Sequence, residues 1–273
     1  MAKTKRRRWS GAALRAAIFL FLCLSQVAPA PAHAGEVEGV TRLRLMTSVT
    51  AHDAAPFLAG IEMKLEKGWH SYWRKPGDSG LAPRFDWSAS RNVASVELKW
   101  PVPERFDEPD DSTFGYRDEI VWPVVVTAKN AAKPVTLVLS MSYGVCSNLC
   151  VPGEADLTLA IPAGAPHATA DAAAVQHYFA RVPVAPADPS AISARADGKH
   201  LVVHYRAAGE APQLIVEGPA GLWFGKPEAA REGDVVAYTV PVETSGTATL
   251  KGARIVLTLS GPATAVEAVR SVE

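Results

Sequence analysis

The feature that most constrains this 273-residue chain is a series of short segments in which apolar side chains occupy every second position. Gly, Pro and Asp bound these segments, which span residues 43–49, 61–65, 96–100, 135–141 and 157–161. A period of two places apolar side chains on one face of a strand, and several such strands in series are typical of an antiparallel sandwich. A further strand, 120–126, contains Pro123, whose missing N–H favours a sheet edge or a bulge.

The composition changes after this series. Residues 163–190 are rich in Ala, Pro and His, which predicts a short helix from Thr169 or Asp171 to Phe179 and then an extended linker. Alternating segments return at 201–205, 214–216, 236–240 and 255–259. We therefore expect an all-β chain in which residues 35–162 form one antiparallel β-sandwich, 163–190 a linker, and 191–273 a second, smaller β-sandwich.

The first 34 residues have the order of a cleavable secretory signal. Five Lys and Arg residues within positions 3–8 precede an apolar run over about 11–27, and Ala32-His33-Ala34 follows. The run is just short of a membrane span, so an uncleaved anchor is the minor alternative, and no later segment is apolar enough to cross a bilayer. We expect cleavage after Ala34 and a soluble periplasmic protein in an oxidising compartment.

Charge and motifs exclude several classes of function. The expected signal carries six basic and no acidic residue, so residues 35–273 have 22 basic and 28 acidic residues and a formal charge of −6. This charge argues against a nucleic-acid partner, which would favour a basic surface. The sequence also contains neither a phosphate-binding loop nor a Rossmann fingerprint, which argues against nucleotide binding. Its serines are not accompanied by His and Asp at a spacing recognisable as a hydrolase triad.

Cys146 and Cys150 are the only cysteines after the expected signal, since Cys23 lies within it. A pair this close in an exported protein is most simply a reversible dithiol or disulfide. One interpretation is a structural staple. Closing a five-residue loop contributes only about 2 kcal/mol, however, against about 4.7 kcal/mol for a hundred-residue loop. A chain of this size can build its core without it.

Two other interpretations of the pair remain open from the residues alone. The two thiolates could hold Cu(I), with His70 completing a trigonal set, whereas a closed zinc site lacks ligands. Alternatively, the pair exchanges thiols and disulfides, which requires an accessible thiolate and a second thiol to resolve the mixed disulfide. Ser147 and Asn148 are small and polar, which suits a turn that exposes the sulfurs.

Several motifs within residues 40–161 together are more specific than any one of them. They are Gly68-Trp69-His70-Ser71-Tyr72-Trp73-Arg74-Lys75-Pro76-Gly77-Asp78-Ser79-Gly80, Trp100-Pro101-Val102-Pro103, Phe114-Gly115-Tyr116, and Tyr143-Gly144-Val145-Cys146 with Cys150-Val151-Pro152. This combination resembles the N-terminal periplasmic domain of the thiol:disulfide interchange protein DsbD, particularly its ScsB-like relatives linked to copper tolerance.

The resemblance implies an immunoglobulin-like sandwich in which Cys146 and Cys150 form the redox-active disulfide and no other cofactor is needed. A membrane-embedded DsbD/ScsB-like electron carrier would reduce the pair, which would then reduce periplasmic thioredoxin-like or disulfide isomerase proteins. This chain reaches Glu273 without an electron channel or a thioredoxin domain, so we expect the carrier to be a separate protein. A Cu(I) module that uses the same two cysteines is the alternative.

The family also shields its cysteines with a cap loop that carries an aromatic residue. Residues 107–117 lie about where that loop should, which makes Phe114 the candidate cap. Candidate modulators are Tyr116, Asp110, Asp111 and His70. A carboxylate near the sulfurs would raise the pKa of a cysteine, and a nearby cationic His70 would lower it.

The aromatic residues Trp69, Tyr72, Trp73 and Trp87 permit two interpretations. We interpret them mainly as core packing, because aromatic side chains dominate the interiors of sandwiches. The alternative is that they flank the sulfurs or bind a peptide of a partner.

Overall fold

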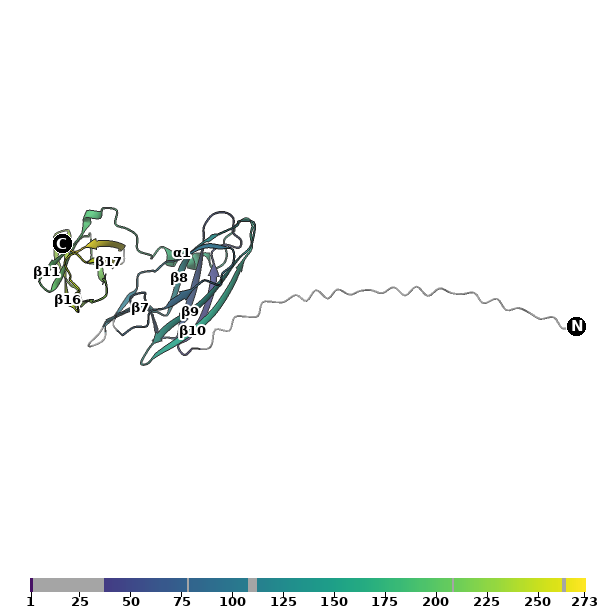
Figure 1. Ribbon diagram of the computed structural model, residues 1–273, viewed down its shortest axis with the longest axis horizontal. Coiled ribbons are helices and arrows are strands. Elements are labelled where there is room, and N and C mark those ends of the chain that lie inside the picture. Colours follow the sequence, from purple (N-terminus) through teal and green to yellow (C-terminus); the bar gives the residue numbers. More distant parts are fainter. Residues whose placement is uncertain (2–36, 78, 108–111, 208, 262–263) are drawn as a thin grey trace. The chain divides into compact units, whose positions relative to one another are not determined.

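The computed structural model describes residues 1, 37–77, 79–107, 112–207, 209–261 and 264–273. The expected secretory signal therefore falls, apart from Met1, outside the described residues, and so do Asp110 and Asp111. The described residues from 37 onward form four antiparallel sheets and little helix, which confirms the all-β prediction (Figure 1). Two sheets come from residues 40–161 and two from residues 192–271.

The sheets of residues 40–161 form the first sandwich. One has the order β1 (Val40–Thr47), β2 (Phe57–Leu65), β8 (Glu119–Ala128) and β5 (Val93–Leu98). The other has the order β10 (Cys150–Ile161), β9 (Val135–Cys146), β3 (His70–Tyr72), β7 (Ser112–Arg117) and β6 (Glu104–Asp107), and β4 (Arg84–Asp86) also pairs with β9. The second of these sheets carries both cysteines.

Alternating apolar side chains of both sheets fill the core of the first sandwich. Ile61 and Met63 of β2 and Trp122 of β8 pack against Leu137 and Leu139 of β9, and all five are completely buried. These are residues that the period-two pattern placed on inward faces, with the exception of Trp122. Burial of such side chains contributes about 1.5–3 kcal/mol each, which fixes the register of the strands.

Pro123 lies neither at a sheet edge nor at a bulge, which were the two predicted positions. Strand β8 lies between β2 and β5, with Pro123 opposite Gly60. The last residue of β5, Leu98, pairs with Val124, and the next amide, that of Lys99, donates to the Pro123 carbonyl. Because N and C=O of one residue point the same way, the nitrogen of Pro123 faces the side on which β5 ends, where no ladder hydrogen bond is lost.

Helix α1 (Ala172–Phe179) follows the first sandwich, close to the predicted position. Asp171 is its N-cap residue, but its side chain makes no capping hydrogen bond. Instead, its carboxylate accepts two hydrogen bonds from Arg44 of β1, at 2.9 and 2.8 Å. Val175 is completely buried against Met46 and Val121, so the helix covers the outer face of the β1–β2–β8 sheet. No helix among the described residues has the length and hydropathy to span a bilayer.

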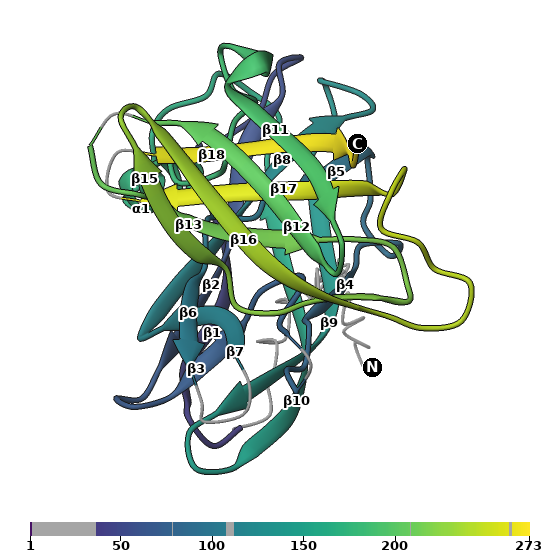
Figure 2. The ribbon, with the colours of Figure 1, turned by 90° about the vertical axis from the view of Figure 1, so that its left-hand side faces the viewer.

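The sheets of residues 192–271 form the second sandwich (Figure 2). It is preceded by the 3-10 turn η1 (Pro189–Ala191). One sheet has the order β11 (Ile192–Asp197), β12 (His200–Arg206), β16 (Val235–Thr244) and β14 (Leu222–Phe224), with β15 (Glu228–Glu232) also paired to β16. The other has the order β13 (Gln213–Glu217), β17 (Arg254–Gly261) and β18 (Thr264–Ser271). Leu201, Val203 and Val240 from one sheet pack with Leu257 and Leu259 from the other.

Candidate redox site

The two cysteines lie at the end of the longest hairpin of the first sandwich. Cys146 is the last residue of β9 and Cys150 is the first residue of β10, and the two face each other in the register. A disulfide joins them, with their Cα atoms 4.1 Å apart. Cys146 is buried, with 7% of its surface exposed, whereas Cys150 is an exposed residue. An incoming thiolate can therefore reach Cys150 more easily than Cys146.

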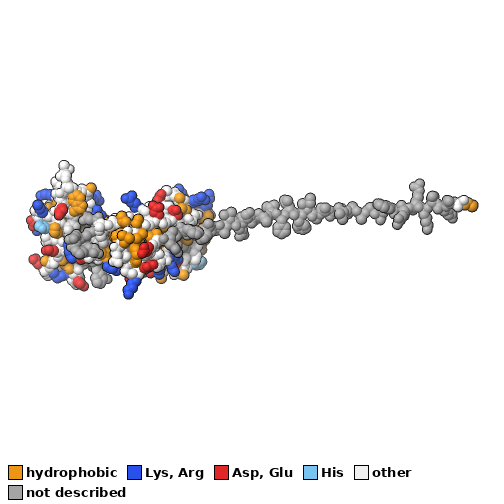
Figure 3. All heavy atoms as spheres, turned by 90° about the horizontal axis from the view of Figure 1, so that it is seen from below, with side chains coloured by type: hydrophobic (Ala, Val, Ile, Leu, Met, Phe, Trp, Pro, Cys, Tyr) orange, Lys and Arg blue, Asp and Glu red, His pale blue; other side chains and the backbone are white. Residues whose placement is uncertain are grey.

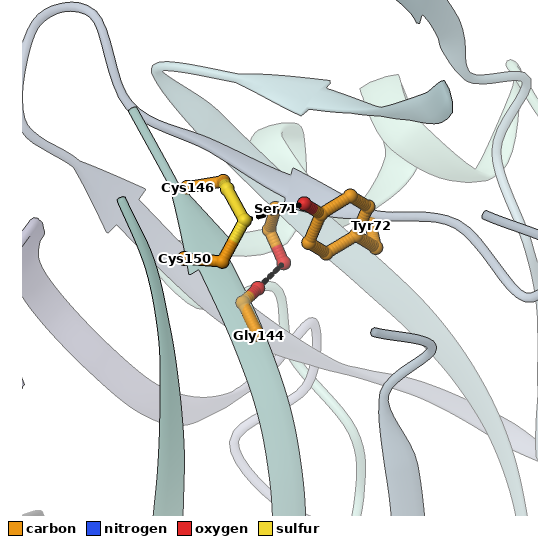
Figure 4. The surroundings of a disulfide bond; sticks show 5 residues. All are labelled: Ser71, Tyr72, Gly144, Cys146 and Cys150. Carbon is orange, nitrogen blue, oxygen red and sulfur yellow. Dashed lines mark hydrogen bonds between the residues drawn. A yellow bond between two sulfur atoms is a disulfide. The ribbon is translucent and has the colours of Figure 1, made fainter. Parts of the chain in front are cut away.

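Strand β3 lies beside β9 and presents two aromatic side chains on the same face as the disulfide. His70 is opposite Cys146 in the register, and strand alternation puts Tyr72 on the same side as His70. The Tyr72 hydroxyl lies 3.4 Å from the Cys150 Sγ (Figure 4). Because a disulfide sulfur carries no hydrogen, the hydroxyl is the donor. Ser71, which points the other way, donates to the Gly144 carbonyl at 3.1 Å and ties β3 to β9.

His70 belongs to an aromatic row that continues onto the neighbouring strands. Its ring centroid lies 4.4 Å from that of Phe106 in β6 and 5.3 Å from that of Tyr72. The Arg117 guanidinium lies 4.3 Å from the centre of the Phe106 ring. The structure thus brings His70 to the strand position beside Cys146, as its candidate role requires, and adds Phe106 and Tyr72 to the surroundings of the site.

The structure does not bring Phe114 to the sulfurs. Gly115 of β7 pairs with Tyr72, so its neighbours Phe114 and Tyr116 point to the opposite face of the sheet. The Phe114 ring packs edge-on against Trp73, with centroids 6.5 Å apart. This placement gives the proposed cap role of Phe114 no support, whereas Tyr72 does contact the disulfide.

Tyr116 also lies in the core, away from the sulfurs. Its hydroxyl donates to the Pro101 carbonyl at 2.9 Å, and its ring packs against Trp122. Burial raises the pKa of Tyr116 well above its usual value, so the phenol stays neutral. The other two candidate modulators, Asp110 and Asp111, lie outside the described residues.

Gly115 allows β3 and β7 to approach closely beneath Tyr72. A Cβ atom on Gly115 would lie 1.8 Å from the Ser71 carbonyl oxygen, which no side chain can tolerate without movement of the strands. The motif Phe114-Gly115-Tyr116 therefore contributes to the site through its glycine, which sets the spacing of the two strands.

Residues 80 and 81 pack over the same face as the disulfide. A Cβ atom on Gly80 would lie 2.8 Å from the Tyr72 ring, and one on Gly144 would lie 2.6 Å from the Leu81 Cβ. These short distances show that Gly80 lies directly against Tyr72 and Leu81 directly against β9. Sequence reasoning missed both contacts, although the glycines of the Gly68–Gly80 motif were a signal that the backbone there approaches another group closely.

The donor set around the cysteines gives the copper alternative no support. In the described part of the chain, no group of three or more His, Cys, Asp or Glu side chains is arranged to hold a metal ion. With both sulfurs in a disulfide, neither is a thiolate ligand.

Comparisons with known proteins agree with this arrangement. The family model described as thiol:disulfide interchange protein DsbD, N-terminal, matches residues 44–162, and one described as a domain of unknown function (DUF8393) matches residues 181–273. The crystal structure of the N-terminal periplasmic domain of ScsB from Proteus mirabilis has a TM-score of 0.65 and 23% identity, over 82% of this chain and 90% of that chain.

Two further comparisons add less. The N-terminal domain of DsbD from Neisseria meningitidis, in the reduced form, has a TM-score of 0.27 and 14% identity, over 45% of this chain and 89% of that chain. A search of curated proteins found no match. The likeness to the ScsB domain covers so much of this chain that it includes both sandwiches. Residues 44–162 therefore match the model of the DsbD N-terminal family, and the chain has the fold of the N-terminal periplasmic domain of ScsB.

Proposed function

We propose that this chain is a periplasmic thiol–disulfide exchange protein that relays two electrons through Cys146 and Cys150. The match of residues 44–162 to the DsbD N-terminal family model supports exchange chemistry by a cysteine pair. The observation that carries the proposal is the asymmetry of the disulfide, in which Cys150 is exposed and Cys146 is buried. Such a pair has one sulfur for the partner and one to resolve the intermediate.

The disulfide accepts electrons in two displacement steps. A thiolate of the donor protein attacks the Cys150 Sγ, which forms a mixed disulfide and breaks the Cys146–Cys150 bond, and Cys146 leaves as a thiolate that takes up a proton. The second thiolate of the donor then attacks the donor's own sulfur in the mixed disulfide, and Cys150 leaves. The donor becomes a disulfide, and the pair has gained two electrons.

The reduced pair passes the electrons on by the same steps in reverse. The Cys150 thiolate attacks a disulfide of the acceptor, and Cys146 resolves the resulting bond. The Tyr72 hydroxyl, 3.4 Å from the sulfur, donates a hydrogen bond to the Cys150 thiolate in this state. Hydrogen bonds to a charged acceptor are about twice as strong as neutral ones, so the hydroxyl favours the thiolate and hence the reduced pair.

The match to the DsbD N-terminal family model and the likeness to the ScsB domain support the choice of donor and acceptor. The donor is a separate, membrane-embedded DsbD/ScsB-like carrier, and the acceptors are thioredoxin-like or disulfide isomerase proteins of the periplasm. The export signal predicted for residues 1–34 and the periplasmic origin of the ScsB domain support this compartment. Protein isolated from the periplasm should begin at Gly35, and a mature form that retains Met1 would contradict cleavage.

Single-cysteine variants test the proposal directly. Cys146→Ser keeps the exposed sulfur and lacks the resolving one, so it should accumulate mixed disulfides with partners in a periplasmic extract. Cys150→Ser keeps the buried sulfur and should trap far less. Mass spectrometry of the trapped species identifies the carrier and the acceptors. If neither variant forms mixed disulfides, or if Cys150→Ser traps more than Cys146→Ser, the proposed asymmetry is wrong.

The reduction potential of the wild-type pair provides a second test. Structural disulfides generally lie below about −300 mV, and exchange-active ones lie higher. Equilibration with dithiothreitol buffers should give a value above that limit. A lower value would assign the disulfide a purely structural role.

A further inference from the structure

The second sandwich binds the end of strand β3 through one arginine. Arg74, two residues after Tyr72, donates to the Glu217 carboxylate of β13 at 2.6 and 3.2 Å and also to the Glu267 carboxylate of β18. Its guanidinium lies 4.3 Å from the centre of the Trp73 ring. We call Arg74, Glu217 and Glu267 the Arg74 clamp.

The two carboxylates converge on Arg74 because of the sheet register. Glu217 is opposite Val256 of β17, and Glu267 is opposite Thr258, two residues further along the same strand. Both therefore lie on one face of the β13–β17–β18 sheet. The Thr258 hydroxyl donates to Glu267 at 3.2 Å, which orients that carboxylate.

The Arg74 clamp is less exposed than the ordinary ion pairs on the surface of the protein. On the face shown in Figure 3, acidic and basic side chains are interspersed, and exposed pairs of this kind contribute little to stability. The side chains of the clamp are only 18–32% exposed, and the planar guanidinium holds both carboxylates with directed hydrogen bonds. Burial lowers the pKa of Arg74, but the hydrogen bonds and charges of both glutamates outweigh burial and raise it, so Arg74 stays cationic.

A second set of contacts joins the same sandwich to the hairpin of β6 and β7. Lys226 lies 3.0 Å from Asp107, which also binds Arg105 and Ser112. Ile215 of β13 is buried in the core cluster of the first sandwich. A cavity of about 590 Å³ is lined by residues of both sandwiches, Phe114 among them. The second sandwich therefore contacts β3, β6 and β7, which lie side by side next to the cysteine-bearing strand β9.

We propose that the second sandwich positions the redox pair, and that Arg74 is the positioning residue through which it acts. This inference rests on the proposed function. The clamp fixes the chain immediately after Tyr72, and the Tyr72 hydroxyl then stays on the Cys150 Sγ. Residues 181–273, which match a family of unknown function, thus acquire a role in setting the reduction potential of a disulfide that lies in the other sandwich.

The proposal predicts the sign of the effect. Loosening the clamp weakens the hydrogen bond to the Cys150 thiolate, so the pair becomes harder to reduce and the pKa of Cys150 rises. A purely electrostatic influence has the opposite sign, because removal of two negative charges favours a thiolate. The direction in which the reduction potential shifts therefore distinguishes a positioning role of the clamp from a purely electrostatic effect of its charges.

The test compares two double variants of the full-length mature chain. Glu217→Gln with Glu267→Gln opens the clamp, and Asp197→Asn with Asp234→Asn removes the same charge from exposed pairs within the second sandwich, Arg195–Asp197 and Arg206–Asp234. In dithiothreitol buffers the clamp variant should be about three- to tenfold harder to reduce, up to about 30 mV for this two-electron couple. The control should match wild type.

Combination with Tyr72→Phe shows whether the clamp acts through the hydroxyl. In that background the clamp variant should cause no further shift, because coupled changes are not additive. The inference would be overturned if the clamp variant shifted the reduction potential equally with and without the Tyr72 hydroxyl. It would also be overturned if the potential rose, or if it did not differ from that of the control. Should the glutamine pair fail to fold, Arg74→Lys, which keeps the charge and loses the planar fork, serves in its place. Failure of the proposed function would instead appear in the wild type, as a pair that does not exchange with thioredoxin-like proteins.

Discussion

The hydroxyl oxygen of Tyr72 lies 3.4 Å from the Sγ of Cys150 and donates a hydrogen bond to it. Tyr72 is nearly completely buried, with 2% of its surface exposed, and Gly80 packs directly against its ring. A buried hydroxyl that faces a sulfur of the redox pair links the packing of the sandwich to the stability of the thiolate.

Tyr72→Phe should therefore lower the reduction potential and raise the pKa of Cys150. A hydrogen bond to a charged group contributes about 1.5–3 kcal/mol. Its loss in this variant should change the equilibrium constant with dithiothreitol about tenfold. The pKa is measured from the pH dependence of alkylation. Tyr205→Phe in β12 removes a hydroxyl from the second sandwich and serves as the control. Equal values for both variants would contradict a role of the Tyr72 hydroxyl.

Gly115→Ala should destabilise the first sandwich, because the added Cβ would lie 1.8 Å from the Ser71 carbonyl oxygen. Forced separation of β3 and β7 should cost about 2–3 kcal/mol in the free energy of unfolding. Urea titration of the oxidised protein measures this loss. At Gly261 in β17 a Cβ would meet its nearest atoms at 3.6 Å, so Gly261→Ala is the control and should change stability little. A Gly115→Ala protein as stable as this control would show that the two strands can separate at no cost.

The strands and the cysteine hairpin could be predicted from sequence because both depend on local pattern. Alternation in 135–141 and 157–161 gives β9 and β10, and the pair at 146 and 150 then falls where the two strands meet. It is harder to predict to which face of the sheet an aromatic side chain in a short strand points. Strand β3 has three residues and β7 has six, so the local pattern does not decide whether Tyr72 or Phe114 faces the sulfurs. The pairing of Tyr72 with Gly115 decides it.

Contacts between distant parts of the sequence could not be predicted. Pro123 lies in an internal strand because β5 ends beside it, which depends on the lengths of two strands that are not consecutive in the chain. The Arg74 clamp joins residues separated by 143 and 193 positions. Arg74 lies in the Gly68–Gly80 motif, but that motif does not indicate which residues Arg74 binds. Only the packing of the two sandwiches brings it to Glu217 and Glu267.

Asp171→Asn should destabilise the protein at neutral pH and have no effect in acid. The hydrogen bonds from Arg44 lower the pKa of Asp171, so its stabilisation is complete above the usual Asp pKa of about 3.9 and is lost as the pH falls through the lower value of the folded state. For this partly exposed pair we expect about 0.5–1 kcal/mol at pH 7. Urea midpoints of both proteins between pH 7 and pH 3 should converge. A constant difference would show that the charge of Asp171 is not the cause.

Leu149→Ser should slow exchange with proteins and leave exchange with small thiols unchanged. Leu149 lies between the cysteines at the tip of the hairpin with 70% of its surface exposed, and Leu81 on the adjoining segment is 43% exposed. A protein partner that reaches Cys150 must cover these apolar side chains, and loss of about 1 kcal/mol of this burial corresponds to about a fivefold slower reaction. Dithiothreitol makes no such contact. Val269→Ser, an exposed apolar residue of β18, is the control, and an equal effect of Leu149→Ser on both reductants would place the defect in the disulfide itself.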